Sequence, residues 1–114
     1  MKVKTSELTG AALDWAVARA NEDYPYGSAK WGEFFAANCE NINYSTDWAQ
    51  GGPIIEREWV SVEKRDNELH WSATLRFANG NRTRERGPTP LIAAMRCYVA
   101  SKLGDEIEVP EELK

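Results

Sequence analysis

The sequence has few of the residues that enzymes use for acid–base, nucleophilic or metal chemistry. It contains one histidine, His70, and two cysteines, Cys39 and Cys97, which do not form a CxxC pair. A zinc site needs several sulfur or nitrogen ligands at short spacings, so the sequence predicts no metal site. Nothing in the pattern aims His70 at a cysteine or a serine, as a nucleophilic pair would require. We therefore predict no catalytic residues, no cofactor and no enzymatic activity.

Long apolar runs are missing too. No stretch approaches the roughly 18 apolar residues of a membrane-spanning helix. The opening Met1–Lys4 is followed by polar residues and not by the apolar core of a signal peptide. Cys97 lies in an apolar helical pattern and is predicted to be a small core residue. We expect no membrane partner and a cytoplasmic location.

The charge is negative overall but unevenly distributed. The 114 residues carry a formal net charge of -4, which argues against a strongly basic nucleic-acid-binding chain. Acidic residues gather in the tail at 105–114. A cationic cluster comes shortly before it and consists of Arg76, Arg82, Arg84 and Arg86.

Helical periodicity predicts a longer helix near each end of the chain, at about 9–20 and 90–103. Thr89 is the predicted cap of the second helix, and Gly104 is its predicted end. The apolar stripe of this helix is predicted to consist of Leu91, Ile92, Met95, Val99 and Leu103.

Between the first helix and the strands the pattern is less regular. Residues 22–43 are predicted to form a variable loop or insert. Ser45 is the expected cap of a short helix that stops at Gly51–Gly52, and Pro53 would open a second one. These signals predict two short helices joined by a glycine hinge.

Three strands follow, at about 59–64, 68–77 and 81–86. The middle strand is predicted from five apolar residues at period two: Leu69, Trp71, Ala73, Leu75 and Phe77. Asn79–Gly80 is typical of a tight hairpin turn because both residues tolerate positive φ. The third strand is polar on both faces, which favours an edge position.

Together these elements predict an α+β fold in a single domain spanning 1–114. Its frame is a small antiparallel three-stranded meander flanked by the N- and C-terminal helices, with short middle helices, in an α/β/α-type sandwich. The acidic tail at 105–114 is expected to dock loosely.

Three segments carry a family resemblance. They are MKVKTSELTGAALDWAVA at 1–18, STDWAQGGPIIERE at 45–58 and GPTPLIAAMRCYVASKLG at 87–104. They closely resemble the NinX family of lambdoid bacteriophages and prophages, and the layout is similar to the phage ABA-sandwich domains. The resemblance implies helices flanking a small sheet and an accessory role in infection. It provides no catalytic residues.

The arginine cluster is the first candidate site. Arg82, Arg84 and Arg86 share one face of the third strand because side chains alternate, and Arg76 lies across the hairpin. Guanidinium groups bind phosphates or carboxylates well. The alternative is that these charges only protect an edge strand from pairing.

The middle segment is the second candidate. Gly51 and Gly52 could let backbone amides approach an anion, or could simply form a tight turn. A P-loop is excluded because its motif is missing. Trp48, Tyr44 and Trp31 could form an aromatic binding surface beside Asp47, or a small satellite cluster of the core. Asp47, Glu56 and Glu58 are better explained as helix-surface acids than as catalytic carboxylates.

The leading hypothesis is a non-enzymatic phage accessory protein in the host cytoplasm that binds a host or phage protein, with counter-defence as one such role. One alternative is a binding or sequestering protein for a small phosphate-bearing ligand such as a nucleotide. A second is nucleic-acid binding. A homodimer formed through the edge strand or the aromatic surface is compatible with all three.

Overall fold

The computed structural model describes residues 2–21, 42–64 and 68–109. Trp31, Cys39 and nearly all of the predicted insert lie outside this part of the chain.

Three longer helices are α1 (Gly10–Ala20), α3 (Trp48–Glu58) and α4 (Pro90–Leu103). One sheet contains β2 (Ser61–Glu63), β3 (Trp71–Arg76) and β4 (Arg82–Gly87). The remaining elements are β1 (Lys2–Lys4), the 3-10 helix η1 (Thr5–Glu7) and β5 (Glu106–Glu108). The α+β class is confirmed.

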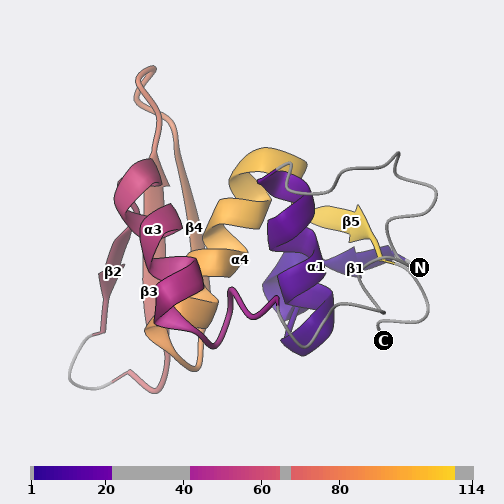
Figure 1. Ribbon diagram of the computed structural model, residues 1–114. Helices are drawn as coiled ribbons and strands as arrows, with labels where there is room; N and C mark the ends of the chain where they lie inside the picture. The colour runs from indigo at the N-terminus through magenta and orange to yellow at the C-terminus, as the bar shows by residue number, and fades with distance from the viewer. Residues whose placement is uncertain (1, 22–41, 65–67, 110–114) are drawn as a thin grey trace.

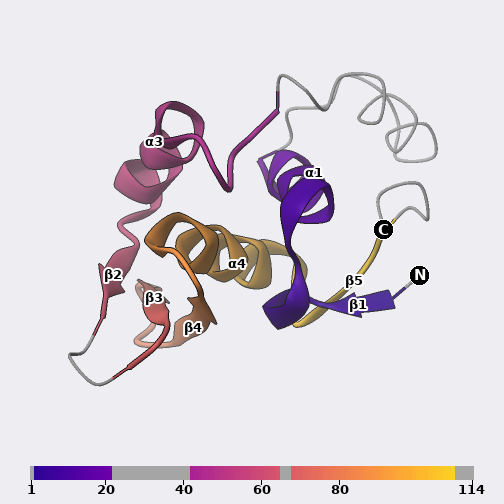
Figure 2. The same cartoon turned by 90° about the horizontal axis from the view of Figure 1, so that it is seen from below.

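Helix α4 lies at the centre of the molecule (Figure 1). On one side it contacts all three strands of the larger sheet, and on the other it contacts α1 and α3. The view from below shows α4 between the sheet and these two helices (Figure 2). The arrangement therefore differs from the predicted sandwich, because α1 covers α4 and does not form a layer on the far face of the sheet.

The burial of α4 also exceeds the predicted stripe. Residues 93–100 are buried on every side of the helix, including Ala93, Cys97 and Tyr98, whereas Ile92 and Leu103 are only half-buried. A helix that is apolar all round is typical of the inside of a domain. Thr89 caps it as predicted, since its Oγ1 accepts a hydrogen bond from the N–H of Ile92 at 3.1 Å.

The predicted glycine hinge is wrong. Residues 48–58 form one continuous helix that contains Gly51, Gly52 and Pro53. Its cap is Asp47 and not Ser45, because the Asp47 carboxylate accepts a hydrogen bond from the N–H of Ala49 at 2.9 Å. Gly51 is buried where α3 meets Leu91 of α4. Tertiary packing thus holds a helix together across a sequence that locally favours a break.

The three-stranded sheet has the order β2-β3-β4, so β4 is an edge strand as predicted. Strands β2 and β3 are shorter than the pattern indicated, whereas β4 is shifted by one residue. Leu69 and Trp59 lie outside them and are 88% and 86% exposed, and Phe77 is 40% exposed. Alternation of apolar residues does not require that all of them reach the core.

The hairpin between β3 and β4 also differs in detail. Gly80 has a positive φ of 90°, but Asn79 does not share it. The N–H of Phe77 donates to the carbonyl oxygen of Asn81 at 2.8 Å, and the N–H of Gly80 donates to that of Phe77 at 3.0 Å. The loop therefore has three residues and ends in a left-handed glycine, a common alternative to the two-residue turn.

The acidic tail is more ordered than predicted. Residues 106–108 form β5, which pairs antiparallel with β1 and places Ile107 opposite Val3. Ile107 and Val109 are buried in the same core as α1 and α4. The Thr5 hydroxyl donates to the Gly104 carbonyl oxygen at 2.6 Å and fixes this junction.

Candidate binding site

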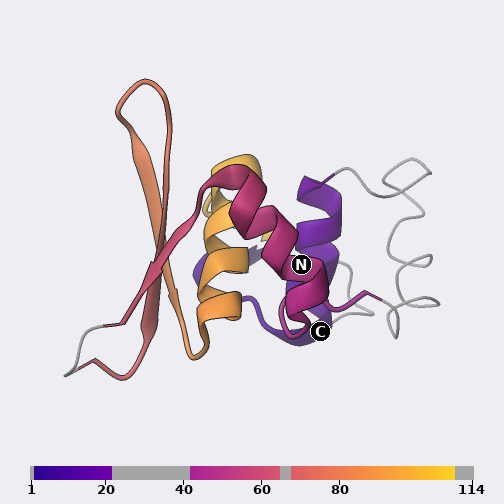
Figure 3. The same ribbon diagram turned by 60° about the vertical axis from the view of Figure 1, so that its left-hand side comes forward.

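The face of the larger sheet that points away from α4 is polar and rich in arginine. In the register of β3 with β4, Arg76 lies opposite Arg82, Thr74 opposite Arg84, and Ser72 opposite Arg86. Opposite residues of antiparallel strands project to the same side, so the four predicted arginines do share one face. No helix is drawn over this outer face in Figure 3. We call Arg76, Arg82, Arg84 and Arg86 on this face the arginine face.

The cationic groups of the arginine face are not neutralised within the described part of the chain. All four side chains are exposed, and none forms an ion pair with another described residue. Arg84 makes one contact, a hydrogen bond from its Nη2 to the Ser72 hydroxyl at 3.3 Å. Arg76 and Arg82 are like charges placed directly opposite each other, an arrangement that destabilises a sheet. Edge protection needs charge on β4 but does not account for Arg76 on the central strand.

Two exposed aromatic residues lie near the hairpin end of this sheet. Trp59 precedes β2, whose Ser61 pairs with Thr74, and Phe77 follows Arg76. Trp59 adopts a left-handed backbone conformation with φ 58°, which costs a non-glycine residue roughly 1–2 kcal/mol. Trp59 thus exposes its indole to solvent although its backbone adopts a conformation that glycine would adopt more easily.

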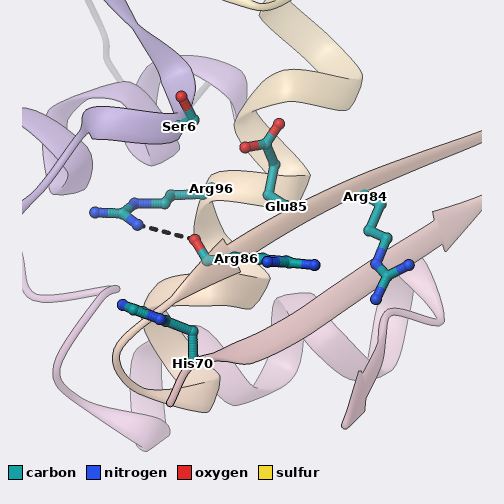
Figure 4. A pocket seen from close by; sticks show the side chains of 6 residues that line it. All are labelled: Ser6, His70, Arg84, Glu85, Arg86 and Arg96. Atoms are coloured by element: carbon teal, nitrogen blue, oxygen red, sulfur yellow. Dashed lines mark hydrogen bonds between the residues drawn. The ribbon is translucent and has the colours of Figure 1, made fainter. Parts of the chain in front are cut away.

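A cavity of about 560 Å³ lies at the outer edge of β4. It is lined by Ser6, His70, Arg84, Glu85, Arg86 and Arg96. Figure 4 shows that the side chains of Arg84 and Glu85 leave β4 on opposite sides, so that the cavity wraps around the edge of the strand. His70 is exposed and lies just before β3.

Arg96 is the most deeply buried cation of this cavity, with only 9% of its surface exposed. It comes from α4, and its Nε donates to the carbonyl oxygen of Leu8 at 2.8 Å. Its Nη1 donates to the carbonyl oxygen of Arg86 at 2.8 Å (Figure 4). Burial lowers the pKa of Arg96, while the charge of Glu85 acts in the opposite direction. Arg96 forms no ion pair with any described residue.

Glu85 and Cys97, which lie near this edge, have shifted pKa values. Burial raises the pKa of Glu85, and the charge of Asp105 adds to the shift, while Arg96 opposes it. Burial also raises the pKa of the Cys97 thiol to about 12. Cys97 donates to the carbonyl oxygen of Thr83 at 3.2 Å and is buried, as its apolar pattern predicted. A thiol with so high a pKa is a poor nucleophile at neutral pH.

The second predicted candidate lies elsewhere on the molecule. Trp48 is 55% exposed and borders a separate cavity of about 210 Å³ together with residues 45–46 and 89–92. Tyr44 is half-buried against the core, and Gly51 packs under it. Asp47 uses its carboxylate for the helix cap. The structure brings the four arginines together on one face but does not place Trp48 in the cavity that Arg84 and Arg86 border.

Sequence reasoning missed four lining residues of the β4-edge cavity, namely Ser6, His70, Glu85 and Arg96. Arg96 carried a usable signal, because an arginine surrounded by apolar residues on a buried helix needs hydrogen-bonding partners. Ser6 and Glu85 carried none, since their position depends on how η1 and β4 pack.

Two features that the described residues lack bear on the kind of site, namely a membrane-spanning helix and a group of metal ligands. No described helix is long and apolar enough to cross a membrane. Among the same residues, no three or more His, Cys, Asp or Glu side chains are grouped so that they could hold a metal ion.

The fold and the site define a small α+β domain with an exposed cationic sheet face and a polar cavity at its edge. A family model described as "Bacteriophage P22, NinX" matches residues 4–102, and the chain belongs to this family. The resemblance seen in the three sequence segments is confirmed, and the chain is a phage-encoded accessory protein. A search of curated proteins found no match.

Proposed function

We propose that this protein is a non-enzymatic binding protein of the host cytoplasm, which uses the arginine face to dock onto an acidic surface of a host or phage protein. The observation that carries the proposal is the set of four exposed arginines, on an uncovered sheet face, that form no ion pair within the described part of the chain. The membership of a phage family makes interference with a host defence protein one suitable role.

The composition of the face supports a protein partner. Arginine and large aromatic side chains dominate the binding energy of protein interfaces, and the exposed Trp59 lies just before β2, at the hairpin end of the same sheet. The chain as a whole carries a net charge of -4, so this face differs in sign from the rest. Such a charge distribution orients an approaching acidic partner and raises the association rate.

The absence of catalysis is part of the proposal and rests on the chemistry of the groups present. The Cys97 thiol is buried with a pKa raised to about 12, and His70 has no thiol or hydroxyl hydrogen-bonded to it within the described residues. The arginine face offers charge and hydrogen-bond donors, which serve recognition.

Charge reversal tests this docking surface. The tagged wild-type protein should retain a stoichiometric partner from host or infected-cell lysate, and Arg82→Glu should weaken that binding by about tenfold or more, mainly through faster dissociation. Lys4→Glu is the matched control, because it makes the same charge change on an exposed residue of β1, which is not part of the arginine face. Binding is measured by surface plasmon resonance once the partner is recovered.

Two results would contradict the proposal. If Trp48→Ala abolishes binding and Arg82→Glu does not, the docking surface lies at α3 and not on the sheet. If nuclease treatment releases the retained material, and binding to DNA falls steeply with salt, the target of the face is nucleic acid.

A further inference from the structure

The β4-edge cavity has a feature that the docking of a protein on the arginine face does not explain. Arg96 is buried inside it and forms no ion pair with any described residue, although the charge of Glu85 acts on it. A buried charge is costly unless it is paired and hydrogen-bonded. Its hydrogen bonds to Leu8 and Arg86 go to backbone carbonyl oxygens, which carry only partial negative charge.

Part of the Arg96 guanidinium remains available to the cavity. A guanidinium has five N–H donors, and the carbonyl oxygens of Leu8 and Arg86 accept from its Nε and Nη1. Among the described residues, two buried side-chain polar atoms lack a hydrogen-bond partner, and they belong to Trp15 and Ser45. No Arg96 nitrogen is among them, so the remaining Arg96 donors are not enclosed in the core without a partner. Arg96 is one of the residues that line the cavity.

Backbone donors of the edge strand point to the same place. Phe77 and Asn81 are joined by a hydrogen bond across the hairpin, so in an antiparallel pair the residues at 82, 84 and 86 direct their N–H and C=O groups away from β3. The hydrogen bond from Arg96 to the Arg86 carbonyl oxygen agrees with this alternation. No described strand pairs with this edge.

The remaining lining residues offer a mixture of groups. His70, Arg84 and Arg86 add donors around the opening, whereas Glu85 and Ser6 provide acceptor oxygens on the helix side. A bare inorganic anion would use only the donors. A phosphate ester that also carries hydroxyl or amino groups would use both sets, and the volume of about 560 Å³ is in the range of small-molecule sites.

We propose that the β4-edge cavity binds a small phosphate-bearing ligand of the nucleotide type, with Arg96 and the outward N–H of Arg86 holding the phosphate. His70 closes over the phosphate from the end of β3, and Glu85 and Ser6 accept hydrogen bonds from the hydroxyl or amino groups of the rest of the ligand. This site shares Arg84 and Arg86 with the arginine face, but Arg76 and Arg82 do not line the cavity. Failure of the docking function and failure of this site can therefore be distinguished with Arg82 variants.

The test is a titration of the full-length protein with AMP and with inorganic phosphate, followed by calorimetry and by backbone amide NMR shifts. AMP should bind saturably and more tightly than phosphate, with shifts centred on 84–86 and 96. Arg96→Gln should weaken AMP binding by about tenfold or more, as expected for a lost charged hydrogen bond.

Because Arg96 also ties β4 to Leu8, Arg96→Gln could unfold the protein, and His70→Ala and Ser6→Ala serve as second variants on exposed residues. Each should weaken AMP binding several-fold. Arg82→Ala is the matched control and should leave it within about twofold, since Arg82 lies on the same strand but outside the cavity. Shifts that stay linear to about 10 mM AMP overturn the proposal. So does equal affinity for phosphate and AMP, or equal weakening in Arg82→Ala and His70→Ala.

Discussion

At the scale of single residues, the informative positions are polar groups inside the core. Asp14 of α1 is only 5% exposed, and its carboxylate accepts a hydrogen bond from the N–H of Ser45 at 2.8 Å. This contact joins α1 to the turn before α3, which are 31 positions apart in the chain. Arg96 has the same character, since it joins α4, the edge of β4 and Leu8, which follows η1.

Asp14 predicts a pH dependence of stability. Burial raises its pKa above the usual 3.8, while hydrogen bonds from Ser45 act against the shift. The native state therefore binds more protons than the unfolded state just above pH 3.8, and the contribution of Asp14 to stability decreases as the pH rises through that window. In Asp14→Asn this decrease should disappear, because the amide oxygen still accepts from Ser45 and carries no charge.

Urea unfolding between pH 4 and 7 measures this effect. At pH 7 Asp14→Asn should be at least as stable as wild type. Asp14→Ala should lose about 1–3 kcal/mol at every pH, because the buried N–H of Ser45 is left unsatisfied. An Asn variant that loses as much as the Ala variant at pH 7 would show that the charge itself stabilises the fold.

At the scale of elements, α3 shows how packing overrides local propensity. Two glycines and a proline in an 11-residue helix predict a break, yet the helix is continuous. Gly51 is required there by close approach, since a Cβ at this position would clash with the carbonyl oxygen of Tyr44 and would lie 2.6 Å from Leu91 Cδ1. The phosphate cradle suggested for this glycine pair is replaced by a helix–helix contact.

Two substitutions test whether Gly51, and not Gly52, is required by close packing. Gly51→Ala should destabilise the protein by about 1–3 kcal/mol, because the added methyl group overpacks a tight contact. Gly52→Ala should stabilise it by about 0.5–1 kcal/mol, because its nearest neighbour would be the Trp48 ring at 3.8 Å and alanine favours helix. Thermal and denaturant unfolding of the two variants provides the comparison. Equal effects of the two substitutions would contradict the packing role of Gly51.

At the scale of the whole molecule, the fold separates two tasks. The core around α4 joins both ends of the chain, while the sheet presents one face to its surroundings (Figure 1). The second sheet, formed by β1 and β5, closes the side opposite the arginine face. The polar surface can therefore vary without disturbing the residues that hold the domain together.

The tail strand predicts a clear effect on global stability. Ile107 is 6% exposed and lies opposite Val3, so Ile107→Ala should cost about 2–4 kcal/mol from lost burial and the cavity left behind. Glu106→Ala is the control on an exposed neighbour and should change stability by less than about 0.5 kcal/mol. A loosely docked tail, as the acidic composition suggested, would make both variants resemble wild type in denaturant unfolding.

The sequence by itself determined the helices at each end, the edge strand, the shared face of Arg82, Arg84 and Arg86, and the family. These features depend on local periodicity, on caps such as Thr89 and on alternation along a strand, all of which are written in neighbouring residues. Tertiary structure decided the continuity of α3, the pairing of β5 with β1 and the burial of Arg96 at the edge of β4. Each of these depends on contacts between residues far apart in the chain, whose packing energy exceeds the local preferences that the sequence displays.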